Sequence, residues 1–266
     1  MKIVLTTLSI GENYTRDYTC RLIDDILKLS DIDVYVTTDS PSIINEIFNG
    51  NSRIKINTVD RNDLKIRIKI NGGYSDDFNF NLRYMCFEPV KDLEDTLVIF
   101  TDCDNSFDWW DTDQVEQFVS KMLIDGYDFY GPRINYRWST YRNEYLNNDK
   151  ANVGIFWHKF YNYDLNPEST EWDEAPLPAE YLLIFYNKDK KLNKFYEQWK
   201  WFHDYLVKKD DSQGTWAEGF EIGVSSFVSG FKGYDLNWNH PLWSKILVAS
   251  GYKNGHRGDI FHQTER

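Results

Sequence analysis

Apolar and polar residues alternate along the first third of the chain in a pattern that predicts strands separated by helices. We expect strands over residues 2–8, 33–38 and 53–59, with helices over 14–29 and 41–48 between them. Each strand is a short apolar run, whereas the helices carry apolar residues on one stripe only. Such alternation favours an α/β fold, in which crossover helices join the strands of a parallel sheet.

A longer apolar run, Leu97 to Asp104, predicts a buried strand that stops abruptly in two acids, and a helix over 79–90 precedes it. A strand that follows three earlier βα units places Asp102 and Asp104 at the carboxyl edge of the sheet, where open α/β sheets bind ligands. At the end of an extended strand, carboxylates two residues apart point the same way and can address one divalent cation. A solvated acidic turn is the alternative interpretation of the same spacing.

The second half of the chain is less regular. It predicts further elements and irregular stretches in this order: a helix over 111–125, a strand over 127–130, a polar and aromatic stretch over 133–150, a strand over 152–157, a loop over 166–178, a strand over 181–186, a helix over 192–208 and another helix beginning near Trp216. No internal repeat or linker divides the sequence, so we expect a single domain over residues 1–266.

Charge and cysteine content narrow the function classes. The 266 residues carry 42 acids against 30 Lys and Arg, a formal charge of −12, which disfavours a general polyanion binder because like charges repel. Three scattered cysteines, Cys20, Cys86 and Cys103, fit neither a disulfide framework nor a zinc knuckle. No signal peptide or bilayer-spanning apolar run is visible, so we expect a soluble, cytoplasmic protein with no membrane span.

The segment from Val98 to Asp104 resembles the Asp-x-Asp motif of glycosyltransferases of the A-type fold. The resemblance implies a Rossmann-like nucleotide-binding sheet with helices on both faces over residues 1–110, continued by an acceptor-binding half over 111–266. It also implies that Asp102 and Asp104 hold Mn²⁺ (or Mg²⁺) against the diphosphate of a nucleotide sugar, most simply a UDP-linked one. A cation is needed there because negative charge builds up on the leaving diphosphate.

The same resemblance assigns further donor contacts. It places Thr6 and Thr7 of the first strand, Asp39 after the second strand, and Cys103 between the two acids beside the nucleotide sugar. It also directs Arg83, in the helix before the motif, towards the donor, although a surface salt bridge is the commoner role for such a residue taken alone.

The remaining metal and acceptor candidates lie in the second half. In this family a His near the carboxyl terminus often completes the metal site; His256 is the first candidate and His262 the alternative, and a tail histidine with no metal role fits both as well. Glu218 and Glu221, three residues apart on an expected helix, are candidates for the acid that accepts the acceptor proton or helps to bind the sugar, and Trp216 is a possible sugar platform. Favourable charge at a helix amino terminus is the competing explanation for both acids.

Arg133 and Arg137 belong to a basic, aromatic strip over residues 133–142 that we assign to acceptor binding, although such strips are more often loops packed on their own domain. Interleaved arginines and aromatic rings can hold phosphates and stack bases, so a modified nucleic acid is an alternative acceptor to a glycan or another hydroxyl compound. The global negative charge disfavours that alternative.

Two other functions compete with glycosyl transfer. A haloacid-dehalogenase-like phosphatase also has an apolar strand followed by Asp-x-Asp, but here Asn105-Ser106 stand where that family has Gly-Thr, and the motif lies far from the start of the chain. A non-catalytic carbohydrate-binding protein would use the abundant aromatics, ten Trp, 18 Tyr and 17 Phe, as sugar platforms. A nicotinamide or flavin enzyme is disfavoured because Gly-x-Gly-x-x-Gly does not follow the first strand.

Overall fold

The structure is a computed structural model of the chain. It describes residues 1–60, 68–70, 73–75, 80–105, 107, 110–132, 134, 137–147, 163–209 and 218–234. The predicted strand over 152–157 lies outside these residues.

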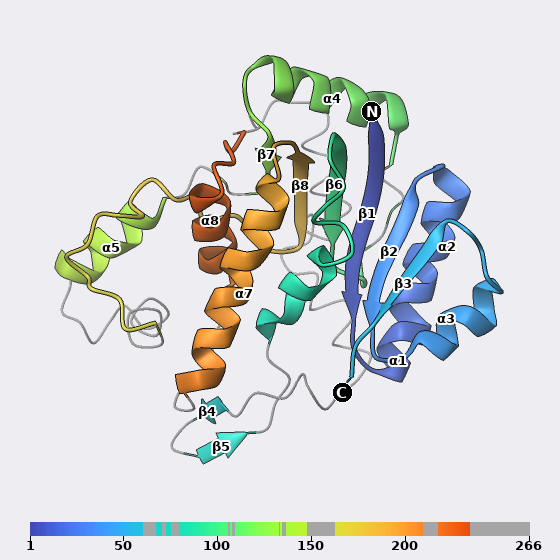
Figure 1. Ribbon diagram of the computed structural model, residues 1–266, viewed down its shortest axis with the longest axis horizontal. Coiled ribbons are helices and arrows are strands. Elements are labelled where there is room, and N and C mark those ends of the chain that lie inside the picture. Colours follow the sequence, from blue (N-terminus) through green and yellow to red (C-terminus); the bar gives the residue numbers. More distant parts are fainter. Residues whose placement is uncertain are drawn as a thin grey trace.

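Six of the described strands form one mixed sheet in the order β3-β2-β1-β6-β8-β7 (Figure 1). Their bounds are β1 Lys2–Ser9, β2 Asp33–Thr38, β3 Ile54–Thr58, β6 Thr96–Thr101, β7 Phe129–Tyr130 and β8 Leu182–Asn187. The first four are parallel, as predicted from the alternation, while β8 runs antiparallel to both β6 and β7. β8 comes from the second half of the chain, so both halves contribute strands to one sheet.

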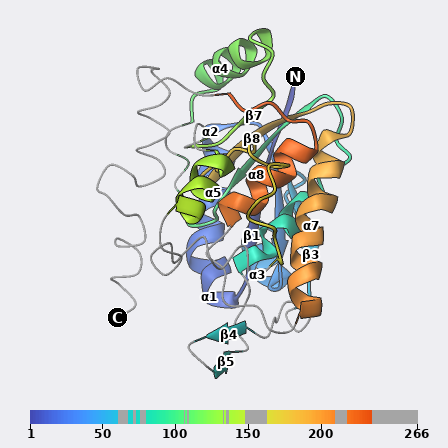
Figure 2. The ribbon, with the colours of Figure 1, turned by 90° about the vertical axis from the view of Figure 1, so that its left-hand side faces the viewer.

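Helices cover both faces of the sheet, as the α/β pattern predicted. On one face lie α2 (Cys20–Leu29), α3 (Pro41–Phe48) and α4 (Thr112–Ile124), and on the other lie the 3₁₀ helix η3 (Phe80–Phe87), α7 (Lys191–Lys209) and α8 (Glu218–Val228). Figure 1 and Figure 2 show α4 beyond the end of the sheet where β1 begins, and the small hairpin of β4 (Ile68–Ile70) and β5 (Gly73–Ser75) beyond the opposite end.

The two faces of the sheet have separate hydrophobic cores because successive side chains of a strand point to opposite sides. On β6, Leu97 and Ile99 join the core beneath α2, α3 and α4, whereas Val98 and Phe100 join the core beneath η3 and α7. All six residues of β6 are buried, which explains why its sequence is apolar without alternation. A third, largely aromatic cluster packs α5 (Trp138–Asn147) against α7 and α8.

Three local predictions differ from the structure. The helix expected over 14–29 starts two residues earlier and contains a π turn, because it is built from α1 (Glu12–Tyr14), η1 (Thr15–Thr19) and α2. The segment expected to be an α-helix over 79–90 is the 3₁₀ helix η3. The stretch over 133–150, for which no helix was predicted, contains α5, whose apolar Trp138 is buried in the aromatic cluster.

Candidate functional site

The candidate site lies at the carboxyl edge of three neighbouring parallel strands. In the sheet order β2-β1-β6, these strands end at Thr38, Ser9 and Thr101, and they are followed by Asp39, by the loop at Gly11 and by Asp102. This edge is the position at which open α/β sheets bind ligands. The structure therefore brings the predicted donor-side acids to one edge.

The two acids of the motif lie on a turn, which corrects the expectation that both extend the strand. β6 ends at Thr101, and the backbone N–H of Asn105 donates to the carbonyl of Asp102 at 3.0 Å. The carbonyl of Tyr181 accepts from the Asp102 N–H at 3.2 Å and from the Asn105 side-chain amide at 2.7 Å. The acidic turn, residues 102–105, is thus fastened to the segment that leads into β8.

Arg83 makes a two-pronged ion pair with Asp102. Its Nε donates to Oδ1 at 2.9 Å and its Nη2 to Oδ2 at 3.3 Å, and the two side chains are 24% and 21% exposed. Burial lowers the pKa of Arg83, but the charges of Asp102, Glu180 and Asp104 outweigh it and the pKa is raised. Arg83 therefore forms the salt bridge that was one interpretation of it, and it also lies at the motif, because its partner is Asp102, the first acid of the motif.

Asp104 is contacted from the first helical segment. Arg21 Nη2 donates to the Asp104 carbonyl at 3.4 Å, and the Tyr14 side chain lies near enough for the Asp104 charge to act on it. Burial raises the pKa of Tyr14, and the nearby Cys103, Asp104 and Asp102 raise it further. Tyr14 therefore keeps its hydroxyl proton beside the acidic turn, although the residue is 37% exposed.

Asp39 ties the loops after β1 and β2 together. Its Oδ1 accepts from the Gly11 N–H at 2.8 Å and from the Ser40 hydroxyl at 2.9 Å. Gly11 has a φ of +100°, a conformation that residues with a side chain rarely adopt. At least one carboxylate oxygen of Asp39 is thus engaged in shaping the edge.

Three of the predicted donor contacts are buried in the framework. Thr6 and Thr7 have no exposed surface; Thr6 donates to the Cys86 carbonyl and Thr7 to the Thr101 carbonyl, the latter at 2.7 Å. Cys103 is 2% exposed, and burial raises the pKa of its thiol to about 12. In this conformation these side chains support the edge from within the fold and present no surface to a donor.

The acceptor-side candidates are only partly described. Glu221 is fully buried on α8, where its carboxylate accepts from the Tyr163 hydroxyl and, at 3.0 Å, from the Trp199 indole N–H. Arg137 is half-buried and donates to the Ile134 carbonyl. Glu218 is the first residue of α8, but its side chain lies outside what the structure describes, as do Arg133, Trp216, His256 and His262.

Sequence reasoning missed Glu180. This residue precedes β8, and because β8 is antiparallel to β6, the start of β8 lies beside the end of β6: Leu182 pairs with Thr101. Its Oε1 accepts from the Gly219 N–H at 3.0 Å, near the amino terminus of α8. The antiparallel pairing of β8 with β6 brings this acid to the same edge as Asp102. No local sequence pattern predicts that pairing.

The donor set of the acidic turn fits a hard cation that also contacts a phosphate. In the part of the chain that the structure describes, no group of three or more His, Cys, Asp or Glu residues is arranged to hold a metal ion. Mg²⁺ and similar ions commonly use only one or two protein carboxylates together with phosphate oxygens. Asp102 and Asp104 supply such carboxylates, and a guanidinium, itself a cation, already lies on Asp102.

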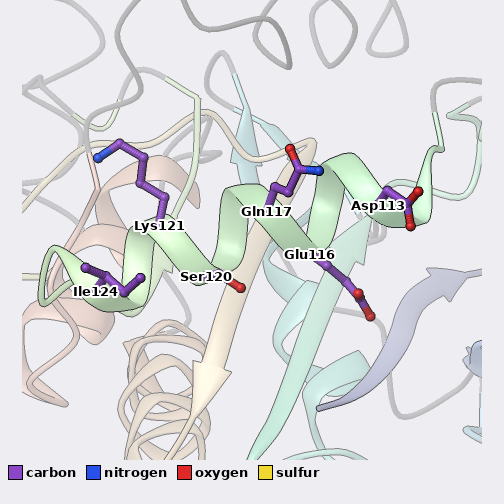
Figure 3. A pocket seen from close by; sticks show the side chains of 6 residues that line it. All are labelled: Asp113, Glu116, Gln117, Ser120, Lys121 and Ile124. Atoms are coloured by element: carbon purple, nitrogen blue, oxygen red, sulfur yellow. The ribbon is translucent and has the colours of Figure 1, made fainter.

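Two surface hollows lie away from this edge. One lies along the outer side of α4, where Figure 3 shows Asp113, Glu116, Gln117, Ser120, Lys121 and Ile124. The other lies between α5 and the loop that follows residue 163, and its described lining includes Trp138, Asp164 and Trp172. Neither hollow contains a residue that sequence reasoning assigned to the site.

Comparisons with known proteins add little to this geometry. No family model matches the chain, and no curated protein matches its sequence. One solved structure with some similarity is the mannosyltransferase PcManGT from Pyrobaculum calidifontis in complex with GDP-Man and Mn²⁺. It has 9% sequence identity and a TM-score of 0.36, over 99% of this chain and 79% of that chain. A TM-score of this size does not establish a common fold, so the residue roles below rest on this chain alone.

None of the described helices combines the length and the apolarity that crossing a bilayer requires.

Proposed function

We propose that the chain is a glycosyltransferase of A type, which moves a sugar from a nucleotide diphosphate sugar to a hydroxyl of an acceptor. The donor is most simply UDP-linked and the acceptor a glycan. The observation that supports this best is the gathering of Asp39, Arg83, Asp102 and Asp104 at the carboxyl edge of β2, β1 and β6, where the Asp-x-Asp resemblance requires a donor site.

In this proposal the acceptor oxygen attacks the anomeric carbon of the donor sugar. The bond from that carbon to the diphosphate breaks, the diphosphate leaves with the bonding electrons, and the acceptor hydroxyl loses its proton. Asp102 and Asp104 would hold Mn²⁺ or Mg²⁺, which when bound supplies positive charge to the leaving diphosphate. His256, or alternatively His262, is the proposed third ligand.

Glu218 is the proposed proton acceptor on the acceptor side. Glu221 was the other candidate, but its full burial between Tyr163 and Trp199 leaves no surface for an acceptor in this conformation. Trp216, Arg133 and Arg137 remain the proposed acceptor contacts.

The phosphatase alternative is less well supported by the sequence. Phosphatases of that type have Gly-Thr after the motif, where this chain has Asn105-Ser106. A carbohydrate-binding protein is separated from a transferase by experiment, because a binder leaves a nucleotide sugar intact.

The test is a thermal-shift screen of UDP-, GDP- and ADP-linked sugars, each with and without MnCl₂, followed by assay of nucleoside diphosphate release. A true donor at 100 times its Kd stabilises the fold by about 2.7 kcal/mol. We expect a manganese-dependent rise in Tm with one nucleotide class, and slow release of its nucleoside diphosphate. No shift with any nucleotide sugar would refute the proposal, and a shift without hydrolysis or transfer would favour the binder.

A further inference from the structure

Arg83 lies near carboxylates from two different parts of the chain. Asp102, on the acidic turn after β6, accepts two hydrogen bonds from its guanidinium, at 2.9 and 3.3 Å. Glu180, just before β8, precedes Tyr181, whose carbonyl accepts from the Asp102 N–H at 3.2 Å, so the fold places Glu180 beside this ion pair. The charges of Glu180 and Asp104 also raise the pKa of Arg83, and of these two acids only Glu180 lies outside the acidic turn.

Glu180 is held in place from two sides. The next residue, Tyr181, fixes the backbone because its carbonyl accepts from the Asp102 N–H and the Asn105 amide. The side chain is fixed by the bond from the Gly219 N–H to Oε1. A Cβ at Gly219 would lie 2.6 Å from the Pro178 carbonyl oxygen, so only glycine lets α8 approach this closely. Glu180 is thus a positioned carboxylate, one residue from the carbonyl that holds the acidic turn in place.

Arg83 can move while its backbone stays fixed. Its neighbours on η3, Leu82 and Tyr84, are 2% and 6% exposed and anchor the helix in the core. The Arg83 side chain itself is 24% exposed and has several rotatable bonds. A rotation of this side chain can therefore exchange one carboxylate partner for another without unfolding η3.

The ion pair at Asp102 conflicts with metal binding at the acidic turn. A divalent cation needs carboxylate oxygens of Asp102, and Arg83 now covers both of them. Two cations on one small carboxylate repel each other. A guanidinium that is displaced without finding another anion would be partly buried and unpaired, which is costly.

We propose that Glu180 is a positioning residue that receives the Arg83 guanidinium from Asp102 when a divalent cation binds at the acidic turn. The inference rests on the proposed function, because it takes the turn to be a metal site. Glu180 acts through Arg83 and is not itself a metal ligand.

The test is the affinity for Mn²⁺ alone, measured from the EPR signal of free manganese as MnCl₂ is titrated at constant ionic strength. Four proteins are compared: the unchanged chain, Glu180→Gln, Arg83→Met and the double variant. The Glu180→Gln substitution keeps a carbonyl oxygen for the Gly219 N–H but removes the charge, and methionine replaces arginine with a long uncharged side chain.

We expect Glu180→Gln to weaken Mn²⁺ binding by roughly 5-fold or more, in line with typical coupling between neighbouring charged residues. Arg83→Met should tighten binding, because the competing cation is gone. In the Arg83→Met background, Glu180→Gln should change the affinity by less than about 2-fold, because Glu180 then has no guanidinium to receive. Glu180→Asp, which keeps the charge, should bind Mn²⁺ more tightly than Glu180→Gln.

Several outcomes would overturn the inference. Equal weakening by Glu180→Gln with and without Arg83 would mean that Glu180 attracts the metal directly, and unchanged affinity would mean that it has no role. Glu116→Gln, an exposed acid of α4 (Figure 3), is the control for loss of one negative charge and should leave the affinity unchanged. If the unchanged chain does not bind Mn²⁺ even when the titration is repeated with UDP present, the metal part of the proposed function fails and the inference falls with it. Normal binding with an unaffected Glu180→Gln protein refutes the inference alone.

Discussion

At the scale of single residues, the structure joins features that the sequence presents separately. The resemblance assigned Asp102 and Arg83 to the donor separately, and the structure places them in one ion pair. The identity of the acids could be predicted because a long apolar run ends in them. Their conformation could not, since the turn depends on the Tyr181 carbonyl, which lies about 80 positions further along the chain.

Glu221 gives a prediction about stability. Replacing this buried acid by alanine leaves the Tyr163 hydroxyl and the Trp199 indole N–H without their acceptor and opens a cavity. We expect Glu221→Ala to lower the free energy of unfolding by about 2 to 4 kcal/mol. Glu221→Gln, which keeps the volume and one acceptor oxygen, should cost less. Urea denaturation followed by tryptophan fluorescence measures both values.

The matched control is Glu46→Ala, which removes an exposed acid from the middle of α3. It should change the free energy of unfolding by no more than about 0.5 kcal/mol. A Glu221→Ala protein as stable as this control would show that the buried hydrogen bonds do not support the aromatic cluster.

At the scale of elements, close packing of α8 on the proline-containing segment 176–180 organises the second half of the site. Gly219 and Gly223 lie four residues apart and so share one face of the helix. Their lack of side chains lets the backbone of this segment pass directly over α8. The same contact places Glu180 at the amino terminus of the helix.

Gly223→Ala tests this packing. A Cβ at this position would lie 1.6 Å from the Pro176 carbonyl oxygen, far inside van der Waals contact. Alanine is the better helix former by about 1 kcal/mol, yet we expect the clash to win and to lower stability by about 3 kcal/mol or more. Thermal denaturation by circular dichroism measures the effect.

Val228→Ala, at an exposed position of the same helix, is the control and should change little. A Gly223→Ala protein with unchanged or raised Tm would mean that α8 does not pack against Pro176 as described.

Helices and strands could be predicted where the spacing of apolar residues was regular. The strand over 33–38 and the helix over 41–48 were predicted at the residues where β2 and α3 are found, because their apolar periods are clear and Pro41 suits a first helical turn. The 3₁₀ form of η3 and the helix α5 were missed. Both depend on packing against distant elements, α7 for η3 and the aromatic cluster for α5.

At the scale of the whole molecule, the α7 helix packs across the sheet and carries a buried histidine that makes stability depend on pH. His203 is 7% exposed, and burial lowers its pKa to about 4, with Lys200 lowering it further and Asp204 opposing both. The folded chain therefore keeps His203 neutral, while the unfolded chain binds a proton below about pH 6.5.

Stability should consequently fall as the pH is lowered from about 6.5 to about 4. A shift from 6.5 to about 4 corresponds to about 3 kcal/mol, since one pKa unit is about 1.4 kcal/mol. His203→Phe keeps a ring beside Tyr84 but cannot titrate, so its stability should decline less over the same range. Urea midpoints measured at several pH values test this, and parallel curves for both proteins would contradict it.

The candidate site as a whole could be predicted in part. The donor edge follows from topology, because parallel strands that end in polar residues bring those residues together. The acceptor side could not be located in the same way, since its proposed residues, Glu218, Trp216, Arg133 and Arg137, are not the residues at which neighbouring parallel strands end. Glu180 could not be predicted, because it lies near Asp102 only as a result of the antiparallel pairing of β8 with β6.

If the acidic turn binds a metal and the donor diphosphate, Asp104→Ala removes one of the two carboxylates that hold the metal. Release of nucleoside diphosphate from the donor found in the screen is measured with MnCl₂ for the unchanged chain and for Asp104→Ala, with urea midpoints as the check on folding. We predict an intact fold and a loss of manganese-dependent turnover of roughly 100-fold or more, because even residues that only orient metal ligands are worth about 10- to 100-fold. Full activity of the Asp104→Ala protein would show that the acidic turn does not hold a metal needed for turnover.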